Sequence, residues 1–200
     1  MKLKHIGITG GIGSGKSTVG RMFTSIGYCL YHADARAKWL MTEDPTLVQQ
    51  VKDLFGPETY FPDGRLNRAF LGNIVFKDAS ALNRLNGIVH PATARDYLQW
   101  IQSIPDAYDK HFALKEAAIM YESGAYKYSD AIITVYAPKS IRLARVIARD
   151  QVEASVVMSR MNKQWPEVEK KRRAEFLIVN DGEHSLVPQV LAAIRWAKQL

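Results

Sequence analysis

The chain has 200 residues, of which 47% are hydrophobic and 24% charged, and its formal net charge is +7. This length suits one globular domain with a small addition, and the composition is that of an ordinary folded protein. No apolar run approaches the roughly 18 residues of a membrane span, and glycines interrupt the apolar segment behind Lys4, so we expect neither a membrane anchor nor a secretory signal. The single cysteine, Cys29, excludes an internal disulfide and favours a cytoplasmic protein.

The positive charge has more than one interpretation. A basic protein can bind nucleic acid, an acidic lipid surface or a polyanionic small substrate. The positive side chains are spread along the chain except for a dense zone from Arg160 to Arg173, which Glu167 and Glu169 interrupt. That zone fits a solvated helix face as well as an anion-binding segment, and charge alone leaves both open.

The first part of the chain predicts a strand, a glycine turn and a helix. Leu3–Thr9 is a short apolar-rich run, and Lys16–Ile26 places its apolar residues at helical spacing. A second strand is expected at Tyr28–Tyr31, followed by helices at Ala35–Met41 and Pro45–Phe55.

The remainder of the chain continues this alternation. Helical patterns run through 63–109, Pro138–Asp150 and Leu186–Leu200, and short strands are expected at Phe112–Ala117, Ala131–Ala137 and Phe176–Val179. Strands that alternate with helices predict an α/β fold with a parallel sheet covered on both faces.

The segment between the first strand and the first helix is rich in glycine. Residues 10–17, GGIGSGKS, fit the pattern G-x-x-x-x-G-K-[ST]. Glycine permits positive φ and removes Cβ atoms, so successive backbone N–H groups can point at phosphate oxygens, and the following helix adds the positive end of its dipole. Lys16 is expected to reach the β- and γ-phosphates and the Ser17 hydroxyl to bind Mg²⁺. The sequence therefore predicts a nucleoside triphosphate site made by Gly11, Ile12, Gly13, Ser14, Gly15, Lys16, Ser17 and Thr18.

Other motifs narrow the class of phosphate-binding protein. A GTPase would carry N-K-x-D, but Asn162-Lys163-Gln164-Trp165 lacks the aspartate. Large ATPases need an apolar strand that ends in Asp or Asp-Glu, and here only Glu116 closes such a strand. A short chain with inserted helices, arginines near residue 145 and a basic segment behind them is typical of a small-metabolite or nucleotide kinase whose lid closes over the phosphates.

Several segments, in order, resemble the signatures of the dephospho-CoA kinase family, and together they cover nearly the whole chain. They are GITGGIGSGKST from Gly7, HADARA from His32, VHPAT from Val89, AAIMYESG from Ala117, RLARVIARD from Arg142, SRMNKQ from Ser159 and AEFLIVNDG from Ala174. Three positions depart from the family pattern: His32 and Glu175 stand where aspartate is usual, and Ala118 where proline is usual.

The resemblance implies transfer of the ATP γ-phosphate to the 3′-hydroxyl of the dephospho-CoA ribose, which gives coenzyme A and ADP. Such a reaction mainly needs positioning and neutralisation of charge, which Lys16, Mg²⁺ and arginines would supply. Asp34, just past the second predicted strand, is the candidate base for the ribose hydroxyl. From the residues alone it is equally an N-cap of the following helix.

The resemblance also assigns ATP contacts outside the glycine turn. Arg145 lies one turn before Arg149, so both can project from one helix face toward the phosphates. Arg149 has the alternative of a salt bridge with its neighbour Asp150. Asn180 is expected in a turn near the adenine.

On the substrate side the resemblance points to His90, Tyr121 and Glu122 as contacts to dephospho-CoA. We expect the dipeptide His90-Pro91 to end a loop and open a helix, and a buried structural histidine is the alternative. Tyr121 can equally be a core residue beside Met120. Two more residues have open roles at this stage: Glu116 is either structural or a ligand of Mg²⁺ through water, and His32 is expected to be a packed or hydrogen-bonded surface histidine.

The expected architecture is a three-layer P-loop NTPase fold with a parallel five-stranded sheet. Its core would comprise residues 1–59, 110–150 and 175–200, with a helical CoA-binding insertion at about 60–110 and a lid at about 150–175. We expect ATP, Mg²⁺ and dephospho-CoA as ligands, no nucleic-acid or membrane partner, and a monomer or weak homo-oligomer. The alternatives are a nucleoside or nucleoside monophosphate kinase of the P-loop class and an ATP-dependent nucleic-acid-binding module.

Overall fold

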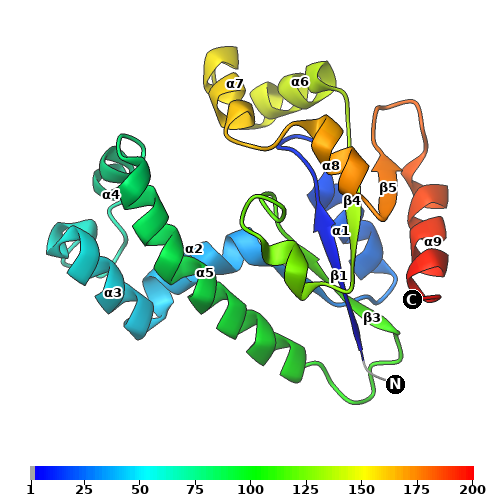
Figure 1. Cartoon of the computed structure of the whole chain (residues 1–200), viewed down its shortest axis with the longest axis horizontal. Coiled ribbons are helices and arrows are strands. Elements are labelled where there is room, and N and C mark those ends of the chain that lie inside the picture. Colours follow the sequence, from blue (N-terminus) through cyan, green and yellow to red (C-terminus); the bar gives the residue numbers. More distant parts are fainter. Residues whose placement is uncertain (1–2) are drawn as a thin grey trace. The chain divides into compact units, whose positions relative to one another are not determined.

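The computed structural model describes residues 3–200, and contacts within the chain divide it into two compact units. The first unit comprises the chain up to His32 and the segment from Asp106 to Leu200, and the second is Ala33–Pro105. Figure 1 shows that the first unit holds the strands, whereas the second is built from helices.

The first unit is organised around one parallel sheet. Its strands are β1 (Lys4–Thr9), β2 (Leu30–His32), β3 (Phe112–Glu116), β4 (Ala131–Tyr136) and β5 (Phe176–Val179), in the order β2-β3-β1-β4-β5. All four pairings are parallel. The predicted α/β fold with a five-stranded parallel sheet is confirmed, and because the strands are parallel their carboxyl ends meet at one edge of the sheet.

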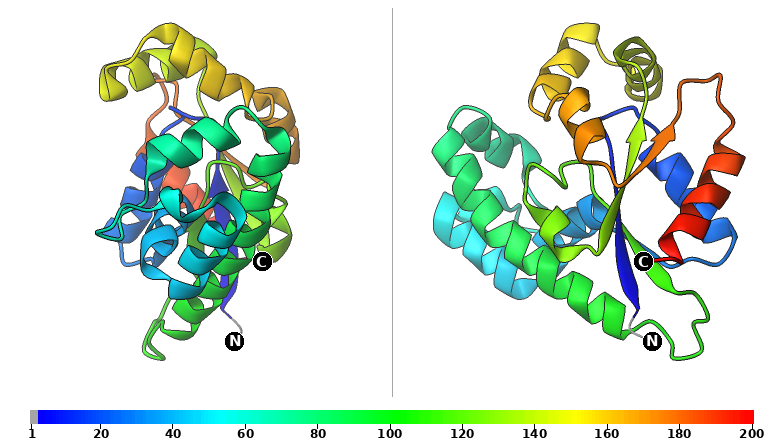
Figure 2. Two further views of the ribbon diagram at one scale, coloured as in Figure 1. Left: turned by 90° about the vertical axis from the view of Figure 1, so that its left-hand side faces the viewer. Right: turned by 45° about the vertical axis from the view of Figure 1, so that its right-hand side comes forward.

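Helices cover both faces of this sheet, as predicted for a parallel sheet. The helices of this unit are α1 (Lys16–Ser25), the 3₁₀ helix η2 (Ala125–Tyr128), α6 (Lys139–Asp150), α7 (Ala154–Asn162), α8 (Glu167–Arg173) and α9 (Leu186–Ala197). Helices α1 and α9 pack together on one face, whereas α8 packs against β4 on the other (Figure 2). The apolar runs of β1 and β4 are fully buried in between, with Ile6, Ile8, Ile133 and Val135 at zero exposure.

The second unit has its own hydrophobic core. It consists of α2 (Ala33–Glu43), α3 (Pro45–Phe55), the 3₁₀ helix η1 (Pro57–Thr59), α4 (Arg68–Val75) and α5 (Ala79–Gln102). These helices bury a shared set of side chains that includes Leu40, Leu47, Val51, Phe55, Leu71, Leu85 and Val89. No helix within residues 3–200 is both long and apolar enough to cross a bilayer.

The helical unit begins earlier than the insertion proposed from the sequence, which starts at about residue 60. Helix α2 packs on α3 and α5, and its Leu40 belongs to the same buried cluster as Leu47 and Leu85. The helices at 33–55, which the sequence analysis assigns to the core, therefore share their core with the rest of the helical unit.

The prediction that His90-Pro91 ends a loop and opens a helix is wrong. Helix α5 is continuous from Ala79 to Gln102, with Pro91 in its interior. An interior proline removes one backbone hydrogen bond, but the apolar face that contains Leu85, Val89 and Ala92 is buried in the core of the unit. Most helix stability in proteins comes from such packing, which here outweighs the local preference of proline.

Tyr108 joins two segments of the first unit that lie far apart in the sequence. Its hydroxyl accepts a hydrogen bond from the Cys29 N–H (3.1 Å) and donates one to the Phe112 carbonyl (2.7 Å), at the starts of β2 and β3. Burial of the ring raises the pKa of Tyr108 to about 12. The hydrogen bond to the Phe112 carbonyl therefore exists only while the hydroxyl is protonated.

We expect Tyr108→Phe to lower the free energy of unfolding by about 1–3 kcal/mol, because it leaves the Cys29 N–H and the Phe112 carbonyl without this partner. Since the folded pKa is raised above the ordinary value of 10, the wild type keeps this contribution below pH 10 and loses it as the pH rises toward about 12. Urea unfolding at pH 7.5 and above pH 10 measures both effects. Tyr128→Phe, at a position 70% exposed, is the matched control and should behave like the wild type.

Candidate active site

The glycine-rich turn lies between β1 and α1, as predicted, and forms a loop with several positive φ angles. Gly10, Gly13 and Gly15 have φ values of 148°, 80° and 97°, which side chains rarely allow. A Cβ at Gly10 would also collide with the Val135 carbonyl oxygen, and one at Gly15 with the side-chain amide of Asn180. Backbone that turns in this way presents its N–H groups as a concave anion-binding surface.

Lys16 occupies the first position of α1 and lies over this loop. Only 8% of the residue is exposed, and its Nζ donates to the carbonyl oxygens of Gly10 (3.0 Å) and Gly11 (3.3 Å). Within the described residues, no side chain caps the start of α1, where Gly15 is the N-cap. The uncapped N–H groups and the lysine charge together favour a bound phosphate.

Glu116 connects the start of α1 with the end of β2. It closes β3 and lies in register with Ile8 on one side and His32 on the other. The Ser17 hydroxyl donates to its Oε1 (3.3 Å), and His32 Nδ1 lies 2.8 Å from its Oε2. The His32 side chain is 48% exposed, so the expectation of a hydrogen-bonded surface histidine is confirmed. Ser17 and Glu116 together place hard oxygen atoms beside the glycine turn, which is the donor type that Mg²⁺ prefers.

Two residues predicted from late segments meet on the glycine turn. Arg145 of α6 donates from Nη1 to the Asn180 carbonyl (2.9 Å) and from Nη2 to Asn180 Oδ1 (3.3 Å). Asn180 follows the end of β5, and its Nδ2 donates to the Ser14 carbonyl (2.8 Å). The structure thus brings Arg145 and Asn180 together, and Asn180 connects the pair to the phosphate-binding loop.

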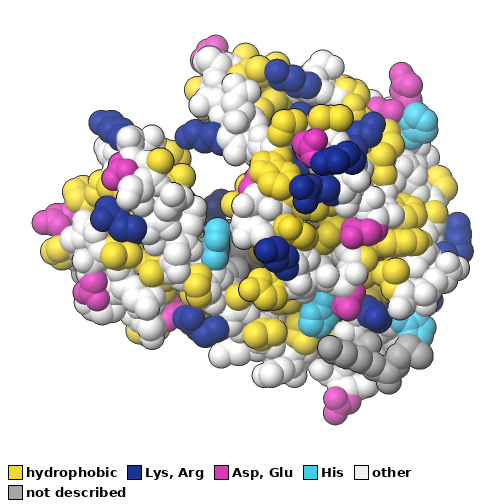
Figure 3. All heavy atoms as spheres, viewed as in Figure 1, with side chains coloured by type: hydrophobic (Ala, Val, Ile, Leu, Met, Phe, Trp, Pro, Cys, Tyr) yellow, Lys and Arg dark blue, Asp and Glu magenta, His cyan; other side chains and the backbone are white. Residues whose placement is uncertain are grey.

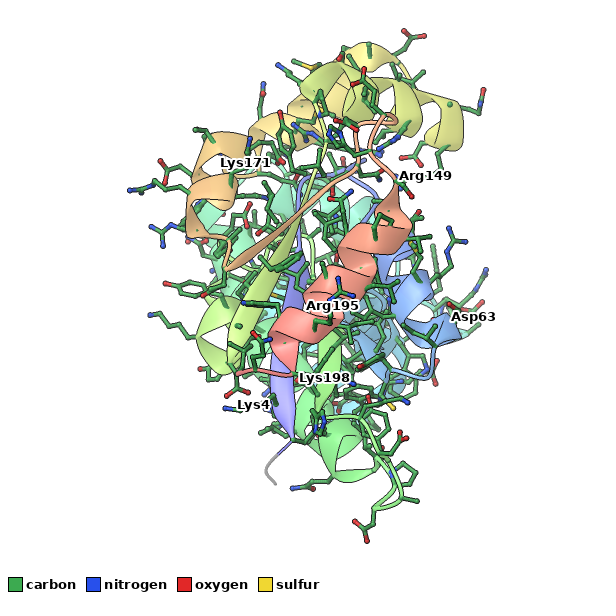
Figure 4. All side chains as sticks on the ribbon, turned by 90° about the vertical axis from the view of Figure 1, so that its right-hand side faces the viewer. Lys4, Asp63, Arg149, Lys171, Arg195 and Lys198 are labelled. Carbon is green, nitrogen blue, oxygen red and sulfur yellow. The ribbon has the colours of Figure 1, made fainter. Side chains whose placement is uncertain are left out.

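Arg149 takes a different direction from Arg145. Its side chain, labelled in Figure 4, is 63% exposed, and its Nε donates to Oδ1 of the neighbouring Asp150 at 2.7 Å. Arg160 binds the other oxygen of Asp150 at 2.9 Å. The hydrogen bond from Arg149 holds the pKa of the Asp150 carboxyl below its usual range. The structure therefore shows the salt bridge that was the alternative, and contact of Arg149 with ATP stays a prediction.

Sequence reasoning missed two residues that contact the loop. Arg142 is only 6% exposed, and it donates to the Ala137 carbonyl (3.1 Å) and the Ile12 carbonyl (3.4 Å). Gln164 accepts the Ile12 N–H through its side-chain oxygen at 2.8 Å. Arg142 lies one turn before Arg145, and Gln164 ends the SRMNKQ segment, so spacing offered a signal for both.

The predicted lid region consists of α7, α8 and the segment between them. Figure 3 shows Lys and Arg side chains gathered over α8, where Lys171, Arg172 and Arg173 are exposed. Arg172 pairs with Glu169 at 2.8 Å, while Lys171 and Arg173 lie over the rings of Tyr136 and Trp165. These basic side chains are largely engaged within their own unit.

Asp34 and His90 belong to the helical unit. Asp34 lies in the first turn of α2, one residue inside the helix rather than at its N-cap, and it is exposed. A negative charge there is stabilised by the helix dipole. His90 is exposed within α5, so the alternative of a buried histidine is wrong.

Tyr121 and Glu122 have partners inside the first unit. Tyr121 is 3% exposed, beside the fully buried Met120, and its ring stacks on Trp165 with centroids 6.2 Å apart. Glu122 accepts the Trp165 N–H at 2.8 Å and lies 2.9 Å from Lys170 Nζ. Both side chains serve the packing of this unit, and their contact with substrate stays a prediction.

Comparison with known proteins agrees with this geometry. The family model described as dephospho-CoA kinase matches residues 4–185. The dephospho-CoA kinase of Bacteroides fragilis is 38% identical over 194 residues, covering 97% of this chain and 93% of the relative, and that of Chlorobaculum tepidum is 39% identical over 181 residues, covering 88% and 86%. Among solved structures, TT1252 from Thermus thermophilus superposes with a TM-score of 0.84 at 30% identity, covering 100% of this chain and 98% of the other. The dephospho-CoA kinase from Campylobacter jejuni gives 0.67 at 26% identity, covering 98% and 96%. This chain belongs to the dephospho-CoA kinase family.

Proposed function

We propose that this chain transfers the γ-phosphate of ATP to the 3′-hydroxyl of the ribose in dephospho-CoA, giving coenzyme A and ADP. The observation that carries the proposal is the connection from Arg145 through Asn180 to Ser14, which joins two distant segments to the phosphate-binding loop. Family membership over most of the chain identifies the acceptor class.

Lys16 and Arg145 are the proposed sources of positive charge at the transferring phosphate. Phosphoryl transfer spreads charge over the oxygens of the moving group, so fixed cations stabilise its transition state. The contacts of Lys16 Nζ with two loop carbonyls fix the direction of its side chain. Arg145 is fixed in the same way by Asn180. Both cations are therefore oriented by contacts within the protein, and we keep Arg149 as a further proposed ATP contact.

Ser17 and Glu116 are the residues that would hold Mg²⁺. Their oxygen atoms lie 3.3 Å apart at the start of α1, and the carboxylate is 11% exposed. An ion there would neutralise negative charge on the β- and γ-phosphates. His32 orients this carboxylate from the other side.

Asp34 is the proposed base for the ribose hydroxyl. It is an exposed carboxylate that follows β2 after one intervening residue, and general bases of this kind take the acceptor proton during transfer. His90, Tyr121 and Glu122 are the further acceptor contacts that the family resemblance implies. We place the activity in the cytoplasm and expect a monomer or a weak homo-oligomer with no nucleic-acid partner.

A panel of acceptors tests the reaction. ADP release with dephospho-CoA should exceed that with AMP, CMP or nucleosides by at least about 100-fold in kcat/KM, because specificity is a difference in transition-state binding. Mass spectrometry of the product should show one added phosphate on the 3′-position. Equal or faster turnover of a nucleotide or nucleoside would assign the chain to that class of kinase instead. Salt-sensitive DNA or RNA binding in a gel shift near physiological salt would favour the nucleic-acid alternative.

A further inference from the structure

Glu122 makes contacts that a substrate-binding residue does not need. Its side chain is 13% exposed and lies in the segment between β3 and η2. One carboxylate oxygen, Oε1, accepts the Trp165 N–H at 2.8 Å and lies 2.9 Å from the Nζ of Lys170, whose side chain is fully buried. The same atom therefore holds both the start and the middle of the segment 165–173.

The residue next to this contact reaches the phosphate-binding loop. Gln164 precedes Trp165 in the chain, and its side-chain oxygen accepts the Ile12 N–H at 2.8 Å. Two adjacent residues are thus bonded to different parts of the unit: the Trp165 N–H donates to Glu122, and Gln164 accepts from Ile12. Because Gln164 and Trp165 are adjacent, the bond that holds the Trp165 backbone also restricts where Gln164 can lie.

Part of this segment borders a pocket. A cavity of about 480 Å³ separates residues 161–167 from the end of β4 and the start of α6, and it is lined by Tyr136, Arg142, Gln164 and Trp165 among others. Across it, Arg142 and Glu167 approach only to 3.7 Å. At Trp165 itself the close contacts include the Glu122 bond, the stacking of Tyr121 on its ring, and Arg173 over the ring at 4.9 Å.

We propose that Glu122 is a positioning residue for the kinase: it fixes the Trp165 backbone so that Gln164 holds the Ile12 N–H and keeps the phosphate-binding loop in its ATP-binding shape. The inference rests on the proposed function where it is tested by kcat and KM. Its test by the Kd of an ATP analogue requires only that the protein binds ATP. It gives Glu122 a role toward ATP, in place of the contact with dephospho-CoA that the family resemblance implies.

The choice of substitutions at Glu122 must take account of the positive charge on its partner Lys170. Removing one member of a buried ion pair leaves the other charge without compensation, whereas replacing both members by residues of similar volume is often tolerated. Glu122→Gln retains an oxygen for the Trp165 N–H but leaves Lys170 without its counter-charge. Glu122→Gln combined with Lys170→Met removes both charges and keeps that oxygen.

The test measures the Kd of a non-hydrolysable ATP analogue, the KM for dephospho-CoA and kcat for Glu122→Ala, Gln164→Ala and both together. The free energy of one hydrogen bond, whether neutral or charge-assisted, corresponds to about a 5- to 20-fold rise in the Kd of the analogue when the bond is lost. Each single variant should show this rise. The Kd of the double variant should not exceed that of the weaker-binding single variant, because both substitutions act through one contact. The KM for dephospho-CoA should stay within about twofold.

Controls separate positioning from stability. Glu169→Gln removes a half-buried carboxylate, paired with the exposed Arg172, from the same helix as Lys170 and should leave all three quantities unchanged. If Glu122→Ala does not fold, the Glu122→Gln and Lys170→Met combination supplies the test: analogue affinity should recover relative to Glu122→Gln alone. Additive effects of Glu122→Ala and Gln164→Ala, or a rise confined to the KM for dephospho-CoA, would overturn the proposal. Absence of dephospho-CoA turnover in the wild type would refute the proposed function and still leave the affinity comparison valid.

Discussion

Lys16→Ala is expected to lower kcat by about 10²–10³-fold, the range seen when one fixed donor to a developing negative charge is removed. Lys16 Nζ lies over the loop, where its hydrogen bonds to the Gly10 and Gly11 carbonyls fix the position of its charge. Alanine keeps a helix-forming residue at the start of α1, whereas the charge and its two hydrogen bonds to the loop carbonyls are lost.

Steady-state turnover of dephospho-CoA and urea unfolding together check this expectation. Lys198→Ala removes an equal charge from an exposed position after α9, which Figure 4 shows at the opposite end of this unit from Arg149 and Lys171. That control should retain wild-type kcat. Retention of wild-type kcat by Lys16→Ala itself would refute the role assigned to this lysine.

The phosphate-binding loop was predictable because the residues that determine its conformation are neighbours in the sequence. Glycines at positions 10, 13 and 15 are needed for backbone that only glycine adopts easily, and the strand before them and the helix after them follow from short apolar patterns. The same holds for the strands, whose continuous apolar runs are typical of a parallel sheet. The sheet was therefore predictable almost residue by residue, with β2 shifted by one or two positions.

Contacts between distant segments were not predictable in the same way. Gln164 bonds to Ile12 across more than a hundred residues, and Lys170 lies inside a segment that composition marks as a solvated basic face. Periodicity reports which residues are buried but not which partner each one meets. At Pro91 a local rule led to a wrong prediction. Proline prefers the first turn of a helix, but here it lies inside α5, whose buried face stabilises the continuous helix.

The boundary of the helical unit illustrates why helices are harder to assign to units than to find. Helices α2 and α3 were predicted close to their observed bounds, yet nothing in their own sequence states whether their apolar faces meet the sheet or α5. The shared burial of Leu40, Leu47 and Leu85 answers that question in the structure. The assignment of α2 to the helical unit matters most for Asp34, which lies in the first turn of that helix.

Asp34→Asn is expected to lower kcat by about 10²–10⁴-fold, the usual contribution of a general base, with ATP affinity nearly unchanged. Asparagine has almost the same shape and is tolerated in a first helical turn, so the change removes proton acceptance and one negative charge. The loss of the favourable charge at the start of α2 should lower the free energy of unfolding by only about 0.3–1 kcal/mol.

Rapid-quench kinetics with saturating ATP and dephospho-CoA separates these two effects, because a stability loss of that size leaves the protein folded at the assay temperature. Asp53→Asn is the matched control, since Asp53 is an exposed carboxylate on α3 of the same unit whose side chain bonds Gln49. It should match the wild type in both kcat and nucleotide affinity. A chemical step that proceeds at the wild-type rate in Asp34→Asn would mean that this carboxylate only stabilises the start of α2, and that the ribose hydroxyl loses its proton to another group.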